Sequence, residues 1–430
     1  MLDKEAWIRE FKDKKILIWG YGMEGKSSYR FIRSLLPDQV ITIADKKKDA
    51  ITDTVNTILL DESKTDFNDY DLILKAPGIV VSEDIDKSKI TGQAPLFLKH
   101  YKKQTIGITG TKGKSTTSSL IASVLKTKYN TFLVGNIGKA CFDIIEDLTE
   151  DALIVFEISC HQLEFSTYSP HVAVYINLFD EHLDHYGTLE KYGKAKDQIF
   201  MHQNEDDILI IGETIKDRAE RENKLIIGKD IYAVNHTVHA ANKEIEIKDC
   251  ALHGEHNYQN LAVAYEIANL YQVSDENYLE AVKEFVPLKH RLENIGTFNS
   301  VTYINDSIST IGETAIKALE TYPETSVILI GGNDRGIVYD KLEETLYAKK
   351  DLQVIFMYAT GKRIHQEMKE KGLVREGLYE VENLDEATAL AKKIAKKDSV
   401  CLLSPAASSY DHFKNFEVRG DYFRKLVEEK

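Results

Sequence analysis

A glycine-rich turn between an apolar run and a polar helix start constrains this chain more than any other feature. The run Thr105–Thr109 predicts a buried strand, and Gly110-Thr111-Lys112-Gly113-Lys114-Ser115-Thr116 follows it. Glycine permits a tight turn, so successive backbone N–H groups can point inward at a phosphate. Lys114 adds a point charge, and the Ser115 or Thr116 hydroxyl can bind Mg²⁺. The segment therefore predicts a loop that binds a nucleoside triphosphate.

This loop is shorter than the usual phosphate loop. The usual pattern has a glycine five residues before the Gly-Lys pair, and this chain has Ile108 there. A short Gly/Lys turn is a solvated helix start without a ligand about as often as it is a phosphate-binding loop. The strand before it, the helix after it and the run from Lys114 to Thr117 together favour a nucleotide.

The length and charge of the chain limit what else it can do. At 430 residues it exceeds what one hydrophobic core usually organises, so two or three domains are expected. Hydrophobic residues make up 43% and charged residues 29%, which is typical of a globular protein. The net charge of −14 argues against nucleic acid as the main partner, whereas an anionic small molecule needs only a few local cations.

The cysteines and apolar runs indicate the compartment. Cys141, Cys160, Cys250 and Cys401 form no C-x-x-C pair, so neither a disulfide framework nor a zinc site is predicted. The charged N-terminus lacks the apolar core of a signal peptide, and no run approaches the roughly 18 apolar residues of a membrane span. We therefore expect a cytoplasmic protein without a membrane span, and we expect it to be a monomer.

A second glycine motif lies near the N-terminus. The apolar run Lys15–Trp19 enters a turn that contains Gly20, Gly22 and Gly25, and Asp45 ends the next predicted strand. In a Rossmann fold such a turn holds a pyrophosphate and such a carboxylate meets a ribose. A lone G-x-G-x-x-G is weak evidence, and the alternative is a tight turn without a ligand. A nicotinamide dehydrogenase that uses this motif is a rival function.

Strands and helices alternate along three segments, which predicts an α/β protein with largely parallel sheets. We expect a Rossmann-like domain at residues 1–97, a central phosphate-loop domain at 98–286 and a C-terminal Rossmann-like α/β domain at 287–430. Residues with chemical function follow predicted strands in all three segments.

Glu157 and His182 are candidate metal ligands near the ends of predicted strands. A carboxylate one or two strands from a phosphate loop suits Mg²⁺, which takes oxygen ligands. By position alone, Glu157 is better interpreted as a solvated acid and His182 as a surface or capping histidine. A zinc site at His182 and His185 is disfavoured, because no cysteine stands near them in the sequence.

Three more charged residues suit nucleotide chemistry. Lys196 lies on a predicted helix, where most lysines are solvated. Arg291 and Asp306 could form a surface salt bridge, which would contribute little. If the third domain closes over a nucleotide, however, a guanidinium for phosphate and a carboxylate for ribose are the groups needed.

Together these motifs resemble the Mur ligase family over essentially the whole chain. The resemblance rests on Gly107 to Thr116, Gly135 to Gly138, Glu157 to Leu163, Asn177 with His182, Lys194 to Lys196, His256 to Asn260, His290 with Arg291, Asn305 to Ser307, and Leu403 to Asp421. It implies an ATP- and Mg²⁺-dependent amide ligase that adds glutamate to UDP-N-acetylmuramoyl-L-alanine through an acyl phosphate, in peptidoglycan precursor synthesis. D-glutamate is favoured; the same reaction with L-glutamate and a non-catalytic UDP-sugar or nucleotide-binding protein are the alternatives.

The resemblance also implies residue roles. The implied ATP contacts are Gly110, Thr111, Lys112, Gly113, Lys114, Ser115, Thr116, Asn260, Arg291 and Asp306. The implied metal ligands are Ser115, Glu157, His182 and a carbamylated Lys196, and the implied catalytic residues are Lys114, Glu157, His182 and Lys196. The implied contacts with the UDP-substrate are Gly20, Gly22, Gly25, Asp45, Asn136, Ser159 and Gln162.

Two departures from the family pattern fall in the implied amino-acid pocket. The implied pocket residues are Thr310, Arg335, Ser409 and Phe416. Members that add glutamate commonly have a lysine at the position of Ile308 and another at the position of Arg335. These changes leave the stereochemistry of the incoming glutamate open.

Overall fold

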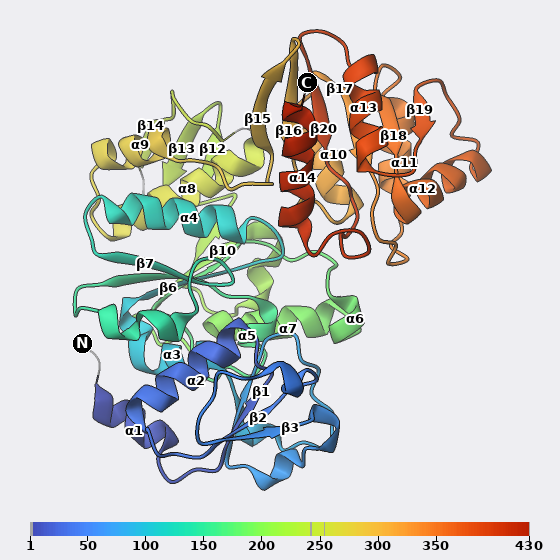
Figure 1. The fold of residues 1–430 in the computed structure, drawn as a ribbon. Helices are drawn as coiled ribbons and strands as arrows, with labels where there is room; N and C mark the ends of the chain where they lie inside the picture. The colour runs from blue at the N-terminus through green and yellow to red at the C-terminus, as the bar shows by residue number, and fades with distance from the viewer. Residues whose placement is uncertain (1–2, 241–242, 253, 430) are drawn as a thin grey trace. The chain divides into compact units, whose positions relative to one another are not determined.

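The structure is a computed structural model that describes residues 3–240, 243–252 and 254–429, apart from the side chains of residues 50, 183 and 184. The chain divides into two compact units. The first unit comprises Met1–Cys250 and His256–Phe285, and the second comprises Ala251–Glu255 and Val286–Lys430. Each unit is built on mainly parallel sheets with helices against them (Figure 1).

The N-terminal sheet of the first unit has five parallel strands in the order β3-β2-β1-β4-β5. The strands are β1 (Ile16–Trp19), β2 (Ile41–Ala44), β3 (Thr57–Leu60), β4 (Leu72–Lys75) and β5 (Ile90–Thr91). The helices are α1 (Lys4–Phe11), α2 (Met23–Leu35) and α3 (Gln93–Tyr101). All four side chains of β1 are buried, as expected for an apolar strand paired on both edges in a parallel sheet.

The second sheet of this unit has six parallel strands in the order β11-β10-β9-β6-β8-β7. The strands are β6 (Thr105–Thr109), β7 (Thr131–Gly135), β8 (Leu153–Glu157), β9 (Val172–Tyr175), β10 (Ile208–Gly212) and β11 (Leu225–Ile227). The helices are α4 (Lys114–Lys126), α5 (Cys160–Leu163), α6 (Leu183–Tyr186), α7 (Leu189–Met201), α8 (Glu255–Leu270) and α9 (Asp275–Glu284). A small antiparallel sheet follows, with β12 (Tyr232–Val234), β13 (Thr237–Ala240) and β14 (Lys243–Glu246).

The second unit contains a six-stranded sheet in the order β15-β16-β20-β17-β18-β19. The strands are β15 (Glu293–Phe298), β16 (Val301–Asn305), β17 (Thr325–Ile330), β18 (Gln353–Phe356), β19 (Leu378–Glu380) and β20 (Ser399–Leu403). The helices are α10 (Gly312–Thr321), α11 (Asp340–Ala348), α12 (Tyr358–Glu370), α13 (Leu384–Ile394) and α14 (Phe416–Glu428). Only β15 among these strands is antiparallel to its neighbour.

The predicted α/β class and the parallel sheets are confirmed. Strand β15 was not predicted, because it has little apolar alternation; it joins β16 through Asn299 and Ser300. Both of these residues have positive φ angles, 51° and 64°, as a tight hairpin turn requires. The edge strand is therefore specified by its turn more than by a hydrophobic pattern.

The two large sheets of the first unit share one hydrophobic core. It includes Ile18 of β1, Phe97 of α3 and Phe156 of β8. The predicted boundary between residues 97 and 98 falls inside α3, so this helix belongs to the packing of both sheets. The two boundaries between the three expected domains remain predictions. Within the described ranges, no helix combines the length and apolar composition that crossing a membrane requires.

Arg419 of α14 is the polar centre of the second unit. Its side chain is fully buried and donates hydrogen bonds to Ser307 Oγ, Ser307 O, Ala407 O and Ser408 O, at 2.7 to 3.3 Å. These acceptors lie in the loops that follow β16 and β20. One guanidinium therefore holds both loops at the carboxyl edge of the sheet.

We predict that Arg419→Met destabilises the second unit by about 3 kcal/mol, because buried carbonyl groups lose their donors. Scanning calorimetry should show a lower melting temperature for the transition of this unit. Arg424→Met on the same helix is the matched control, since Arg424 makes a partly exposed ion pair with Glu293 that should contribute under about 1 kcal/mol. Equal melting temperatures for the two variants would contradict the role assigned to Arg419.

Candidate active site

The phosphate loop connects β6 to α4 in the first unit. Gly110 and Gly113 have φ angles of +155° and +85°, a region that side chains with a Cβ rarely adopt. Gly113 occupies the N-cap position of α4, so the helix begins at Lys114. The N–H groups of a first helical turn point toward the helix start and, together with the helix dipole, favour the binding of an anion there.

Asn177, which follows β9, holds this loop in place. Its Oδ1 accepts hydrogen bonds from the N–H groups of Thr111 (3.1 Å) and Lys112 (2.9 Å), and its backbone oxygen accepts from Thr111 N–H (3.0 Å). The sequence motif contains Asn177 but does not predict this role for it. These two N–H groups therefore have acceptors within the protein, and the acceptors hold the loop in its turn.

The lysines of the loop are drawn toward acceptors of the protein itself. Lys114 Nζ donates to Gly110 O and Thr111 O, both at 3.0 Å. Lys112 Nζ forms an ion pair with Glu181 Oε1 at 2.8 Å. These contacts hold the two positive charges at the loop. Thr116, in the first turn of α4, is buried.

Glu157 is the last residue of β8 and its side chain is fully buried. Residue pairing sets it opposite Ile108 on β6, directly before the phosphate loop. Its Oε1 accepts a hydrogen bond from Asn136 Nδ2 at 3.3 Å, whereas its buried Oε2 has no hydrogen-bond partner in the described part of the chain. A buried carboxylate oxygen without a donor fits a cation ligand, because burying an uncompensated charge is costly.

Lys196 of α7 is buried beneath the phosphate loop. Its Nζ donates to Gly110 O at 2.8 Å and lies 4.7 Å from the centre of the Tyr192 ring. Burial, and then the charge of Lys114, lowers the pKa of Lys196 to about 7. A substantial fraction of this amine is therefore neutral near neutral pH, and the neutral amine is the form that carbon dioxide can carbamylate. The structure thus fits the predicted modification without testing it.

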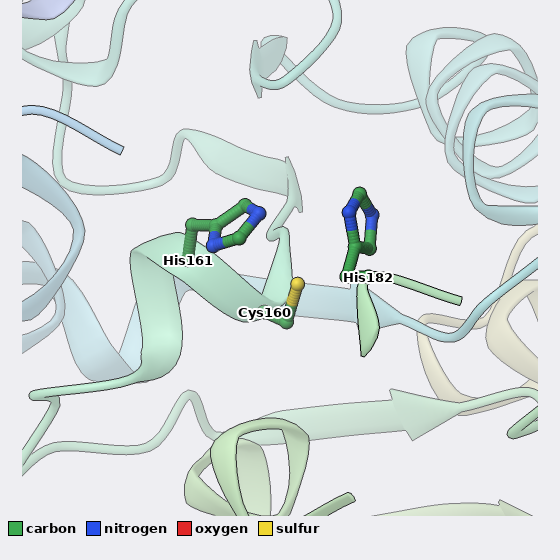
Figure 2. A group of neighbouring side chains, drawn as sticks. All are labelled: Cys160, His161 and His182. Atoms are coloured by element: carbon green, nitrogen blue, oxygen red, sulfur yellow. The ribbon is translucent and has the colours of Figure 1, made fainter. Parts of the chain in front are cut away.

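His182 lies in the loop before α6 and has a φ angle of +56°. Its side chain is exposed, and its ring centre is 5.0 Å from that of His161 on α5. One donor atom each from Cys160, His161 and His182 lies within 4.8 Å of the others (Figure 2). No cysteine stands near His182 in the sequence, but α5 brings Cys160 close to it in space. Burial, and then the charges of His182 and His185, lowers the pKa of His161 to about 3.

Asn260 of α8 is a predicted nucleotide contact outside the phosphate loop, and in the first unit it lies close to the start of α4. Its Oδ1 accepts a hydrogen bond from Thr117 Oγ1 at 3.1 Å. A Cβ added at Gly113 would lie 3.3 Å from the same oxygen. The glycine therefore allows α8 to approach the start of α4.

The turn after β1 is held by Asp45. Its Oδ2 accepts from Tyr21 N–H and its Oδ1 from Lys47 N–H, both at 2.7 Å. A Cβ at Gly25 would come within 2.1 Å of Gly20 O, so this glycine is needed for close packing of the turn. Gly22 lies at the N-cap of α2, with nothing near the position of a Cβ. Asp45 thus supports the turn through its carboxylate, and contact with a ribose stays a prediction.

Ser159 and Gln162 connect this turn to the second sheet. Ser159 caps α5, and Gln162 completes a reciprocal capping box with it. Gln162 Nε2 also donates to Glu24 Oε1 of α2 at 2.6 Å. Burial raises the pKa of Glu24 to about 7, against the opposing effects of Gln162 and Lys75. Glu24 was not predicted as a site residue, because its only signal in the sequence is an acidic residue inside the glycine motif.

The predicted site residues of the second unit gather at the carboxyl edge of β16, β20 and β17. Asp306 is buried, with Oδ2 accepting from Ser404 Oγ (2.8 Å) and Oδ1 from Leu292 N–H (3.3 Å). Arg291 lies in the turn before β15, where its backbone N–H donates to Leu288 O at 3.3 Å.

The predicted amino-acid pocket lies on the same edge. Arg335 Nη2 donates to Thr310 O at 3.2 Å. Asn333 N–H donates to Ser408 O at 2.8 Å, which joins the loop of Arg335 to the segment before Ser409. The segment at Phe416 is joined through Ser307, whose Oγ donates to Phe416 O at 2.8 Å. Hydrogen bonds therefore link the segments that carry all four predicted pocket residues.

The fold and the phosphate loop define an α/β nucleotide-binding protein with an anion site at a helix start. Residues 108–268 match the model of the Mur ligase middle domain. The UDP-N-acetylmuramoylalanine--D-glutamate ligase of Oenococcus oeni is 30% identical over 98% of both chains. The enzyme of the same name from Aquifex aeolicus is 33% identical over 96% of this chain and 98% of its own length. The chain belongs to the Mur ligase family.

Solved structures agree with this fold. MurF from Acinetobacter baumannii has a TM-score of 0.64 at 15% identity, covering 100% of this chain and 93% of its own. MurF ligase from Thermotoga maritima in complex with ADP has a TM-score of 0.62 at 16% identity, covering 100% and 97%. The resemblance inferred from the sequence motifs is thereby confirmed for the family and the fold.

The low pKa of Lys196 predicts a pH-dependent contribution to stability. The folded protein releases this proton near pH 7, whereas the unfolded chain retains it up to the ordinary value of 10.5. The cost of the buried ammonium therefore acts in full below about pH 7 and declines as the pH rises toward 10.5. The melting temperature of the wild type minus that of Lys196→Met should rise between about pH 6 and about pH 9.

This measurement needs buffers free of carbon dioxide, so that carbamylation does not change the charge. Lys194→Met on the same helix is the matched control, because its side chain is 71% exposed. Its melting temperature should differ from that of the wild type by a constant amount over the same pH range. A pH-independent difference for Lys196→Met as well would show that Lys196 is not buried as an amine of low pKa.

Proposed function

We propose that this protein joins D-glutamate to UDP-N-acetylmuramoyl-L-alanine in a reaction that consumes ATP and requires Mg²⁺. The observation that carries the proposal is Glu157, a buried carboxylate with one unpaired oxygen on the strand beside the phosphate loop. Similarity to D-glutamate ligases along nearly the whole chain supports the substrate assignment. A cytoplasmic location and a monomeric state stay predictions from the sequence.

In the proposed reaction, the terminal carboxylate of the alanyl substrate attacks the γ-phosphate of ATP. The resulting acyl phosphate is attacked by the amine of glutamate, and phosphate leaves from a tetrahedral intermediate. Such chemistry is accelerated mainly by positioning and by neutralising phosphate charge.

Residues of the first unit would bind the nucleotide and the metal. The first turn of α4 would receive the phosphates, and Lys114 would turn from the carbonyl oxygens it now contacts to the γ-phosphate. Ser115, Glu157, His182 and a carbamylated Lys196 would hold Mg²⁺, which supplies positive charge to the phosphates when bound. Asn260 would support the nucleotide from α8.

The remaining assignments concern the two other ligands. Arg291 and Asp306 of the second unit would contact phosphate and ribose of ATP. The glycine turn with Gly20, Gly22, Gly25 and Asp45 would receive the UDP pyrophosphate, and Asn136, Ser159 and Gln162 would line the path of the muramoyl-alanine part.

The direct test measures phosphate release from ATP in the full-length protein. Release should require both UDP-N-acetylmuramoyl-L-alanine and glutamate, with D-glutamate clearly preferred over L-glutamate. A preference for the L-enantiomer would contradict the stereochemical assignment. Binding of the UDP-substrate without ATP turnover would instead support a non-catalytic binding protein.

Arg335 should decide the affinity for the amino acid. A guanidinium can clamp a carboxylate with two hydrogen bonds, whereas a lysine offers a single point charge. We predict that Arg335→Ala raises the KM for glutamate about tenfold or more, with little change in the KM for ATP, and that Arg335→Lys restores it only in part.

Lys362→Ala is the control for this measurement. Lys362 pairs with Glu382 on the surface of the same unit, and such a pair contributes little. Its KM values should match those of the wild type. An equal rise in both KM values for Arg335→Ala would indicate a general disturbance of the unit and would refute the pocket assignment.

A further inference from the structure

Three potential metal ligands from two separate segments lie together in the first unit. Cys160 and His161 begin α5, shortly after β8, and His182 lies in the loop that follows β9. Figure 2 shows the Cys160 sulfur between the two imidazole rings, with all three side chains projecting to the same side. One donor atom from each lies within 4.8 Å of the other two. A magnesium site does not account for this set, because Mg²⁺ takes oxygen ligands and not thiolates.

We propose that Cys160, His161 and His182 form a binding site for Zn²⁺. One thiolate and two imidazoles are donors that zinc prefers, at bond lengths of about 2.3 Å to sulfur and about 2.0 Å to nitrogen. Those lengths place tetrahedral donors roughly 3.3 to 3.6 Å apart. The three donor atoms lie within 4.8 Å of one another, so each pair must close by at most about 1.5 Å. His182 is exposed on a loop and can make this adjustment by rotating its side chain. The fourth position would be filled by water or an anion.

Tyr186 provides the outer support that a histidine ligand needs. Its hydroxyl forms a hydrogen bond with His161 Nδ1 at 3.2 Å, and the two rings are stacked with their centres 5.5 Å apart. A partner at Nδ1 fixes the ring and leaves Nε2 to face an ion, which is the usual arrangement around zinc.

A second group of donors shares His161 but suits a cation less well. It consists of His161, Glu164 and His185, with His185 Nε2 at 3.5 Å from Glu164 Oε2. The ammonium of Lys75 lies 3.8 Å from that same carboxylate oxygen and opposes a metal ion there. Because one donor atom of His161 serves one ion, the two groups are alternatives.

The charge balance also favours the group that contains the cysteine. The positive charge of Lys75 acts on His161. Metal binding releases the thiol proton of Cys160, so the ligand set gains a negative charge that offsets it. The rival group already carries its carboxylate charge, which Lys75 neutralises.

Zinc at this site would have a consequence for catalysis, and this part rests on the proposed function. His182 is a proposed ligand of Mg²⁺, so an ion held by Cys160 and His161 would withdraw it from the catalytic metal. Zn²⁺ should therefore inhibit the ligase reaction, and Cys160→Ser should be less sensitive while keeping its basal rate with Mg²⁺.

The test of binding uses the full-length protein without substrates. Titration with Co²⁺ should produce the visible absorption of tetrahedral cobalt and a thiolate charge-transfer band, and Zn²⁺ should displace the cobalt with micromolar or tighter affinity. Cys160→Ser should lose the thiolate band and weaken zinc binding by at least about 100-fold, the upper cost of losing even an outer-shell partner. His161→Phe should weaken it similarly.

Two controls make the outcome decisive. The first is Cys250→Ser, which removes a thiol outside the proposed zinc site and should leave both the cobalt spectrum and the zinc affinity unchanged. The second is the melting temperature of each variant, which shows whether that variant is folded. Absence of cobalt binding by the wild type, or an unchanged thiolate band in Cys160→Ser, would overturn the proposal. Loss of binding in Glu164→Gln with retention in Cys160→Ser would assign the ion to the rival group. A protein without ligase activity that still shows the thiolate band would refute the proposed function and not the zinc site.

Discussion

Parallel strand pairing is the constraint on which the chemistry of this protein depends. Each strand of a parallel sheet ends at the same edge, so loops from distant parts of the sequence meet there. In the second sheet, pairing of β6 with β8 and β9 brings the phosphate loop, Glu157 and Asn177 to one edge. Any shift of register by one residue would turn Glu157 to the other face of the sheet and separate it from Asn136.

The two glycine turns of the first unit are supported in the same way. Asp45 accepts the N–H group of Tyr21, and Asn177 accepts those of Thr111 and Lys112. In both cases a side chain that follows a neighbouring strand holds the backbone just after the first glycine. This support fixes the turn before a ligand arrives, so less conformational entropy is lost on binding.

The sequence predicts the residues whose local pattern is complete and misses those whose role depends on distant partners. The phosphate loop, the α/β class and the family follow from glycine spacing and strand-to-helix order. Local pattern does not give the roles of Glu24, Asn177 and Arg419, because hydrogen-bond partners of these residues lie 138, 66 and 112 positions away in the chain. Sequence reasoning also treated the cysteines as isolated, although α5 brings Cys160 beside His182. Such pairings are set by the packing of elements, which periodicity does not report.

Lys196 shows how one physical cause can serve both structure and chemistry. Removing the ammonium from water is costly, and the nearby charge of Lys114 increases the cost, so the neutral amine is favoured. A neutral amine is a nucleophile, whereas an ammonium is not. Carbamylation would replace the penalised cation with an anion next to Lys114, which turns a repulsive pair into an attractive one. The burial that destabilises the unmodified lysine is therefore the same property that would drive its conversion into a metal ligand.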